Sequence, residues 1–108
     1  MRVNNLKSFI MINKIPTKIG GANLICYVIL DSRHIKTGNT EHWVGGQILE
    51  EVYGLAICKY DNDTGYYLFY CNRNWETITD TFHDTVEDAK DQAEFEFSNT
   101  VSTWIHKF

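Results

Sequence analysis

Short apolar runs separated by turn-forming residues cover much of the chain, and this pattern predicts an antiparallel sheet. Residues 24–30 are apolar and rich in β-branched side chains, as expected of a strand covered on both faces. Residues 52–60 and 66–71 form two further runs, and residues 61–65 between them have the composition of a tight hairpin turn. Residues 75–82 supply a third strand, so this region predicts a β-meander.

The remaining segments are less regular. Residues 8–15 contain an apolar run that ends before Pro16, which has no N–H to donate, so they are expected to form a first or edge strand. Gly20-Gly21 marks a turn, and the polar residues 34–42 predict a loop. Gly54 indicates a bulge or a close backbone approach within its strand.

A helix is predicted to begin near Val86. Thr85 is a candidate N-cap with Asp88 three residues later, a capping box that uses Asp in place of Glu. Asn99 tolerates the left-handed backbone that ends many helices. The apolar positions that share one face, and should pack on the sheet, are Val86, Ala89, Ala93 and Phe97.

These elements predict one α+β domain over residues 1–108, a two-layer antiparallel sheet of about five strands with one helix from the C-terminal half packed on it. The apolar tail of residues 101–108 is expected to pack back as a strand or a short turn. Residues 66–71 are apolar on both sides of their strand. Because one helix covers only one face, the second face is left for the remaining chain, a second copy or another protein.

The negative charge is concentrated in the second half of the sequence. The net charge is −4; residues 1–54 carry six basic and four acidic side chains, and residues 55–108 carry four basic and ten acidic ones. Such a surface repels nucleic acid and anionic membranes and attracts a basic partner. No segment approaches the ~20 apolar residues of a membrane span, and the N-terminus lacks the apolar core of a signal peptide, which predicts a cytoplasmic protein.

The three cysteines are expected to be free and buried. Cys26, Cys58 and Cys71 are odd in number and lack the spacing of a zinc site. The predicted hairpin places Cys58 opposite about Phe69 and Cys71 opposite about Ala56, so their sulfurs are offset and a disulfide between them is not expected.

Candidate catalytic groups are few. Cysteines inside apolar strands have raised thiol pKa values, which disfavours a nucleophilic role. The glycine pairs lack the pattern of a phosphate-binding loop. No catalytic residue, metal or cofactor is therefore expected, although His83 beside Asp80 and Asp84 is the best placed of the histidines. The histidines, none at metal-ligand spacing from another, are His34, His42, His83 and His106.

Acidic residues dominate the predicted helix and the strand before it. They form either a solvated outer face or a surface that steers a basic protein, and nearby aromatic rings could anchor such a partner. A nucleic-acid platform built on the same aromatics would need Lys and Arg around it. The residues predicted to bind a protein partner are Trp75, Asp80, Asp84, Glu87, Asp91 and Glu94.

Several motifs of residues 24–104 carry a likeness to known proteins. They are Gly54-Leu55-Ala56-Ile57-Cys58-Lys59-Tyr60, Tyr67-Leu68-Phe69-Tyr70-Cys71, Trp75, Thr79-Asp80, His83 and Glu87-x-Ala89-Lys90-x-Gln92-Ala93-Glu94-x-Glu96. On these residues the chain resembles a group of small uncharacterised bacterial single-domain proteins. Its size and acidity are similar to those of immunity proteins, and Thr85, Glu87 and Ala89 resemble the helix start of HicB-type antitoxins.

The sequence therefore predicts a non-enzymatic protein-binding module, most concretely an immunity- or antitoxin-type inhibitor of a basic bacterial toxin. Two alternatives stay open. One is a small ligand-binding or hydrolase-like domain centred on His83 and Asp80. The other is a structural subunit that forms a homodimer through the free face of its sheet.

Overall fold

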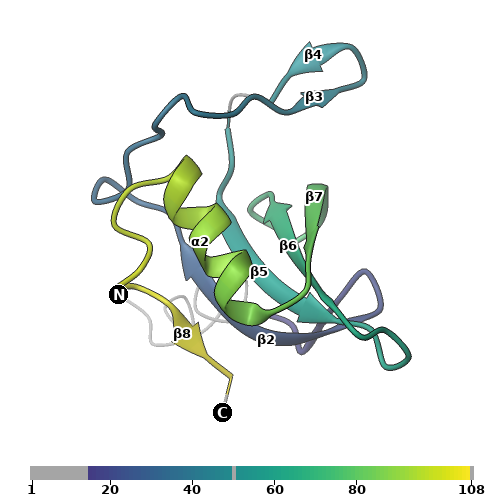
Figure 1. Ribbon diagram of the computed structural model, residues 1–108. Helices are drawn as coiled ribbons and strands as arrows, with labels where there is room; N and C mark the ends of the chain where they lie inside the picture. The colour runs from purple at the N-terminus through teal and green to yellow at the C-terminus, as the bar shows by residue number, and fades with distance from the viewer. Residues whose placement is uncertain (1–14, 50, 108) are drawn as a thin grey trace, which may run out of the picture.

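The computed structural model describes residues 15–49 and 51–107. Within them one helix packs on a curled antiparallel sheet, which confirms the predicted α+β class (Figure 1). The strand predicted over residues 8–15 lies outside these residues except for Ile15. The strands of the main sheet are β1 (Lys18–Ile19), β2 (Ala22–Ile29), β5 (Gly54–Lys59), β6 (Tyr66–Cys71), β7 (Thr77–His83) and β8 (Ile105–His106).

The strands lie in the order β1-β2-β5-β6-β7, and β8 also pairs with β2. The last three of the path form the predicted meander. The C-terminal tail does return to the sheet, because His106 of β8 lies opposite Cys26 of β2. The hairpin register is two residues away from the predicted one, since Cys58 lies opposite Tyr67. The turn begins earlier than expected, with the Asp63 N–H donating to the Tyr60 carbonyl at 3.1 Å.

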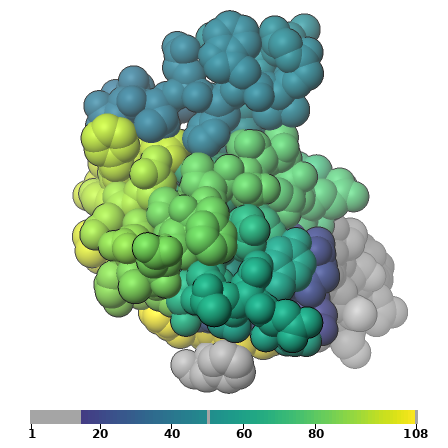
Figure 2. Space-filling model, turned by 45° about the vertical axis from the view of Figure 1, so that its right-hand side comes forward, coloured from purple at the N-terminus to yellow at the C-terminus, as the bar shows by residue number. Residues whose placement is uncertain are grey.

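A second, two-stranded sheet stands away from the main one. It consists of β3 (Trp43–Val44) and β4 (Gln47–Ile48), joined by Gly45 and Gly46. These glycines have φ values of 59° and 82°, the left-handed backbone that a two-residue hairpin turn requires. The sequence pattern indicates only an interruption here. The segment that carries this hairpin projects from the body of the molecule (Figure 2).

The helix α2 (Val86–Glu96) lies across one face of the main sheet (Figure 1). Thr85 is its N-cap, and the Asp88 N–H donates to the Thr85 hydroxyl at 3.0 Å, as predicted. Asn99 has the predicted left-handed backbone, with φ 68°. Small alanines allow α2 to approach the sheet closely. The buried residues of this face are Cys26, Leu55, Ile57, Leu68, Tyr70, Ala89, Ala93 and Phe97.

The opposite face is filled by the chain's own aromatic side chains. Trp75 lies at the end of this face where β5 begins, and its ring lies over Gly54, where an added Cβ would come within 2.5 Å of Trp75 Cη2. The close approach predicted at Gly54 is therefore confirmed. Half-buried tyrosines surround this cluster. Its buried members are Ile19, Ala22, Leu24, Ala56, Cys58, Phe69, Cys71 and Trp75.

The three cysteines are free and buried, as expected. Burial raises the pKa of Cys26 to about 11 and that of Cys58 to about 12. Burial likewise raises the pKa of Cys71 to about 12. All three remain protonated near neutral pH and act as small apolar side chains.

Candidate functional site

The solvent-facing side of α2 carries a row of carboxylates. Glu87, Asp88 and Asp91 are exposed on the helix, and Asp84 is exposed just before its N-cap. Within residues 15–49 and 51–107, the ion pairs are Arg33–Asp31, His34–Asp31 and His42–Glu96. None of these pairs involves the row, so its charges are not neutralised by a neighbour in that part of the chain.

Lys90, the one cationic residue of α2, is directed elsewhere. Its Nζ lies 5.9 Å from the centre of the Trp104 ring and 3.1 Å from Nε2 of His106. The C-terminal tail, rather than Glu87 or Asp91, therefore receives this side chain. The exposed part of α2 stays negative along its first two turns.

Glu94 has a structural task. Its carboxylate accepts hydrogen bonds from the Asn99 N–H at 3.1 Å and the Val101 N–H at 2.9 Å. The Thr100 hydroxyl donates a third at 3.0 Å. Burial opposes ionisation of Glu94, but these donors outweigh it and lower its pKa. Glu94 thus stabilises the turn that follows α2. Its carboxylate is occupied by these donors, unlike the exposed acids that were predicted to bind a partner with it.

Trp75 and Asp80 lie on the face opposite α2. Asp80 is the cross-strand neighbour of Phe69, and such neighbours point to the same face. Phe69 belongs to the aromatic cluster around Trp75. The expectation that Trp75 offers a surface ring is wrong, because it is only 4% exposed. It packs edge-on against Tyr27, with the ring centres 5.7 Å apart.

The structure does not bring His83 and Asp80 together. They are three residues apart on one strand, so their side chains point to opposite faces. His83 Nε2 lies 2.7 Å from the Thr81 hydroxyl. Burial lowers the pKa of His83, while Asp88, Glu96 and Asp84 act in the opposite direction. The geometry gives no shared site for the proposed hydrolase-like pair.

A buried network that the sequence analysis did not identify lies at the C-terminal end of α2. Glu96 is 4% exposed and accepts hydrogen bonds from the Tyr70 hydroxyl and from Nε2 of Gln92, the latter at 2.7 Å. Nε2 of His42 lies 2.7 Å from Oε1 of Glu96. The His42 ring also rests on Tyr70, with the ring centres 4.4 Å apart.

The network fixes the charge state of Glu96. Burial raises the pKa of Glu96, but hydrogen bonds from four side chains lower it by a larger amount, so the net shift is downward from 4.5. The four side chains are those of Tyr70, Gln92, Thr40 and His42. The pKa of Tyr70 is raised by burial and by the neighbouring Glu96 carboxylate. Both carboxylate oxygens of Glu96 have hydrogen-bond partners, so the group holds structure together rather than offering a free base.

The same network ties a long connecting segment to the helix. The Thr37 N–H donates to the Glu96 carbonyl at 2.9 Å, and Asn39 Nδ2 donates to the Phe95 carbonyl at 2.8 Å. Together with His42, these contacts seat the segment before β3 on the end of α2. Glu96 follows Ala93 by three residues, a spacing that places it on the sheet-facing side of the helix. That spacing was the signal in the sequence that could have predicted the burial of Glu96.

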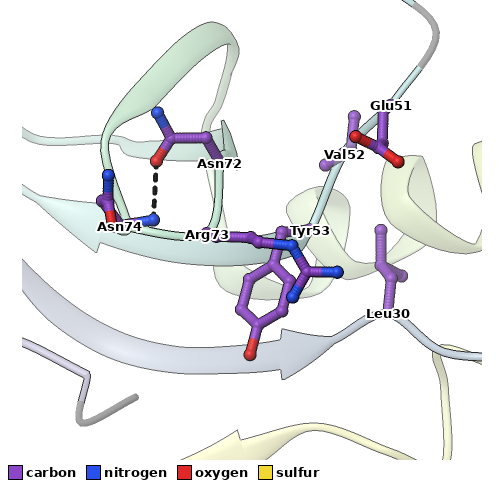
Figure 3. A pocket seen from close by; sticks show the side chains of 7 residues that line it. All are labelled: Leu30, Glu51, Val52, Tyr53, Asn72, Arg73 and Asn74. Atoms are coloured by element: carbon purple, nitrogen blue, oxygen red, sulfur yellow. Dashed lines mark hydrogen bonds between the residues drawn. The ribbon is translucent and has the colours of Figure 1, made fainter. Parts of the chain in front are cut away.

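A shallow hollow of about 420 Å³ lies at the end of the sheet where β2 and β6 finish and β5 begins. Arg73 extends across it, with its guanidinium 5.1 Å from the centre of the Tyr53 ring (Figure 3). Asn72 is engaged in its own turn, where it accepts from the Asn74 N–H at 2.9 Å. None of the predicted binding residues lines it. The lining residues are Leu30, Glu51, Val52, Tyr53, Asn72, Arg73 and Asn74.

No group of three His, Cys, Asp or Glu side chains in the described part of the chain is arranged to hold a metal ion. No helix of that part is both long and apolar enough to cross a membrane. Comparison with models of protein families, with curated proteins and with solved structures gives no match.

Proposed function

We propose that this protein is a non-enzymatic binding module, an immunity- or antitoxin-type inhibitor of a basic bacterial toxin. The observation that carries the proposal is the row of exposed carboxylates at α2, formed by Asp84, Glu87, Asp88 and Asp91. A contiguous surface of one sign speeds the encounter with an oppositely charged protein and selects against others.

The helix's own stability does not account for the whole row. Acids in the first turn, Glu87 and Asp88, favour the positive end of the helix dipole. Asp91 lies beyond that turn and is four residues from Glu87, a spacing at which like charges repel. The repulsion between Glu87 and Asp91 destabilises α2 slightly when no partner is bound. A cationic partner would reduce that repulsion. Binding therefore explains Asp91 better than folding does.

An exposed apolar residue follows the row of carboxylates along α2. Phe95 is four residues after Asp91 and is 50% exposed. It supplies the aromatic anchor that Trp75, being buried, does not offer. In protein interfaces a few residues, large aromatic ones among them, contribute most of the binding energy.

Affinity capture from native lysate, followed by mass spectrometry, tests the proposal. Two double variants are compared with the unaltered chain: Glu87→Lys with Asp91→Lys, and Glu41→Lys with Glu51→Lys. Both change the net charge equally, and all four residues are exposed. We expect a basic protein to be captured by the unaltered chain and by the second variant but lost by the first.

Two results would contradict the proposal. One is capture of the same protein by the variant reversed at Glu87 and Asp91. The other is a captured set without a basic protein. Co-expression then tests inhibition: the unaltered chain should restore growth to cells that produce the captured protein, and the helix variant should not.

A further inference from the structure

The two edges of the main sheet differ in length. One edge consists of β1 and β8, which have two residues each and both pair with β2, whereas β7, at the other edge, has seven residues. β7 pairs with β6 on its inner side, and no strand of the described residues pairs with its outer side. In an antiparallel strand about half of the backbone N–H and C=O groups point away from the neighbouring strand. β7 therefore presents a long row of backbone groups that no strand of residues 15–49 or 51–107 pairs with.

Its sequence has few of the features that normally protect such an edge. Edge strands are commonly shortened or interrupted by proline, lysine or a bulge. β7 reads Thr-Ile-Thr-Asp-Thr-Phe-His, without proline or lysine and with residues that favour extended backbone. Its one irregularity lies at its start, where the register shifts between Tyr70 and Cys71 of β6. Phe82 near its far end is 50% exposed.

The charges of β7 and its immediate flanks are negative, and the nearest cations along the chain, Arg73 and Lys90, lie over the Tyr53 and Trp104 rings. Residues 74–89 contain five carboxylates and neither Lys nor Arg. Asp80 faces the side of the aromatic cluster, and the others lie at the start of β7 or where β7 runs into α2. A strand placed along β7 would meet acids on both sides of the sheet. The five, all exposed, are Glu76, Asp80, Asp84, Glu87 and Asp88.

We infer that the open edge of β7 binds an extended segment of the partner that is rich in Lys or Arg, which adds to the sheet as a further strand. The inference rests on the proposed function and names the part of the basic partner that is recognised. Backbone hydrogen bonds provide the pairing, and the surrounding acids select the alternate basic side chains. A second copy of β7 fits less well, because it would bring the same acids together across the new pair.

Three peptides test the pairing by fluorescence anisotropy with the full chain. The first alternates lysine with threonine or valine, the second is its twin with N-methyl groups on alternate backbone amides, and the third has glutamate in place of lysine. We expect the first to bind about tenfold more tightly than the other two. Hydrogen exchange with the first peptide should slow the amides of β7.

A pair of variants adds a second test. Asp80→Lys, at an exposed position of β7, should weaken binding of the lysine peptide about tenfold, whereas Glu51→Lys, exposed outside β7, should change it less than about twofold. Equal binding of the lysine peptide and its N-methyl twin overturns the edge inference. Absence of binding by the lysine peptide does so too. The affinity capture from native lysate tests the proposed function separately, because it does not depend on how β7 pairs.

Analytical ultracentrifugation at increasing protein concentration tests the alternative that a second copy of the chain pairs with β7. A chain that stays monomeric supports the inference. Self-association that slows hydrogen exchange of the β7 amides at high concentration would show that β7 pairs with a second copy, and it would overturn the inference.

Discussion

The two faces of the main sheet are filled by different chemistry. Behind α2, small alanines and aliphatic side chains surround a buried carboxylate, Glu96, which takes part in a hydrogen-bond network. On the opposite face, rings pack on one another around Trp75. The stability of the first face should therefore depend on pH, and that of the second should not. The two faces also differ in what they offer a partner. The helix side carries the exposed acids of α2, whereas Trp75 on the opposite face is buried.

The largest expected effect is the loss of Trp75. Trp75→Ala removes a large buried ring from the aromatic cluster and should lower the free energy of unfolding by about 3–5 kcal/mol. Denaturant unfolding measures this. Trp43→Ala is the matched control, because Trp43 is 62% exposed; its effect should stay within about 0.5 kcal/mol. Similar effects for the two tryptophans would contradict the assignment of Trp75 to the core.

Gly54→Ala should have the next largest effect, on the same face. The added methyl group would lie 2.5 Å from Trp75 Cη2 and 3.1 Å from the Val28 carbonyl oxygen, so a destabilisation of about 1–3 kcal/mol is expected. Calorimetric unfolding of Gly54→Ala, of Trp75→Ala and of the double variant forms a cycle. The cost of Gly54→Ala should fall when Trp75 is absent. Strictly additive effects would mean that the ring does not occupy the space over Gly54.

On the helix side, Glu96→Gln should lower the free energy of unfolding by about 2 kcal/mol at neutral pH, because an amide cannot accept from all the donors around Glu96. The folded-state pKa of Glu96 lies below its ordinary value of 4.5. The charge of Glu96 therefore contributes stability above that pH, and the contribution is lost as pH falls through the lower folded-state pKa.

The pH dependence distinguishes the two faces. The difference between the unaltered chain and Glu96→Gln should shrink steadily below pH 4.5. The difference between the unaltered chain and Trp75→Ala should stay constant over the same range. Denaturant unfolding across this range measures both, and a Glu96→Gln difference that does not change with pH would contradict the role given to the network.

The smallest expected effect is at the start of α2. Thr85→Ala removes the acceptor of the Asp88 N–H and should cost about 1 kcal/mol. Thr85→Ser keeps a hydroxyl and should cost much less. Thermal unfolding compares the two, and equal losses would show that the cap contributes through its methyl group rather than its oxygen.

Local patterns were sufficient to predict most of the fold. The meander, the helix start at Thr85 and the buried positions Ala89 and Ala93 all depend on neighbours within a few residues. The hairpin of β3 and β4 was missed because each strand has only two residues. The register of β5 and β6 was misjudged because it depends on where within a polar turn the chain reverses.

The site was harder to predict, because its contacts are distant in sequence. Glu96 meets Tyr70 across 26 positions and His42 across 54, and no local pattern indicates such partners. The burial of Trp75 depends in the same way on Tyr27 and Tyr53. Exposed acids on α2, by contrast, follow from helix periodicity alone.

Hydrogen exchange of the chain alone and in complex with the captured basic protein tests the central claim most directly. Binding through the acidic helix and the adjoining edge predicts slower exchange in β7 and the first turns of α2, with little change around Tyr27 and Tyr53. Protection confined to the aromatic face, or to the hairpin of β3 and β4, would contradict the account.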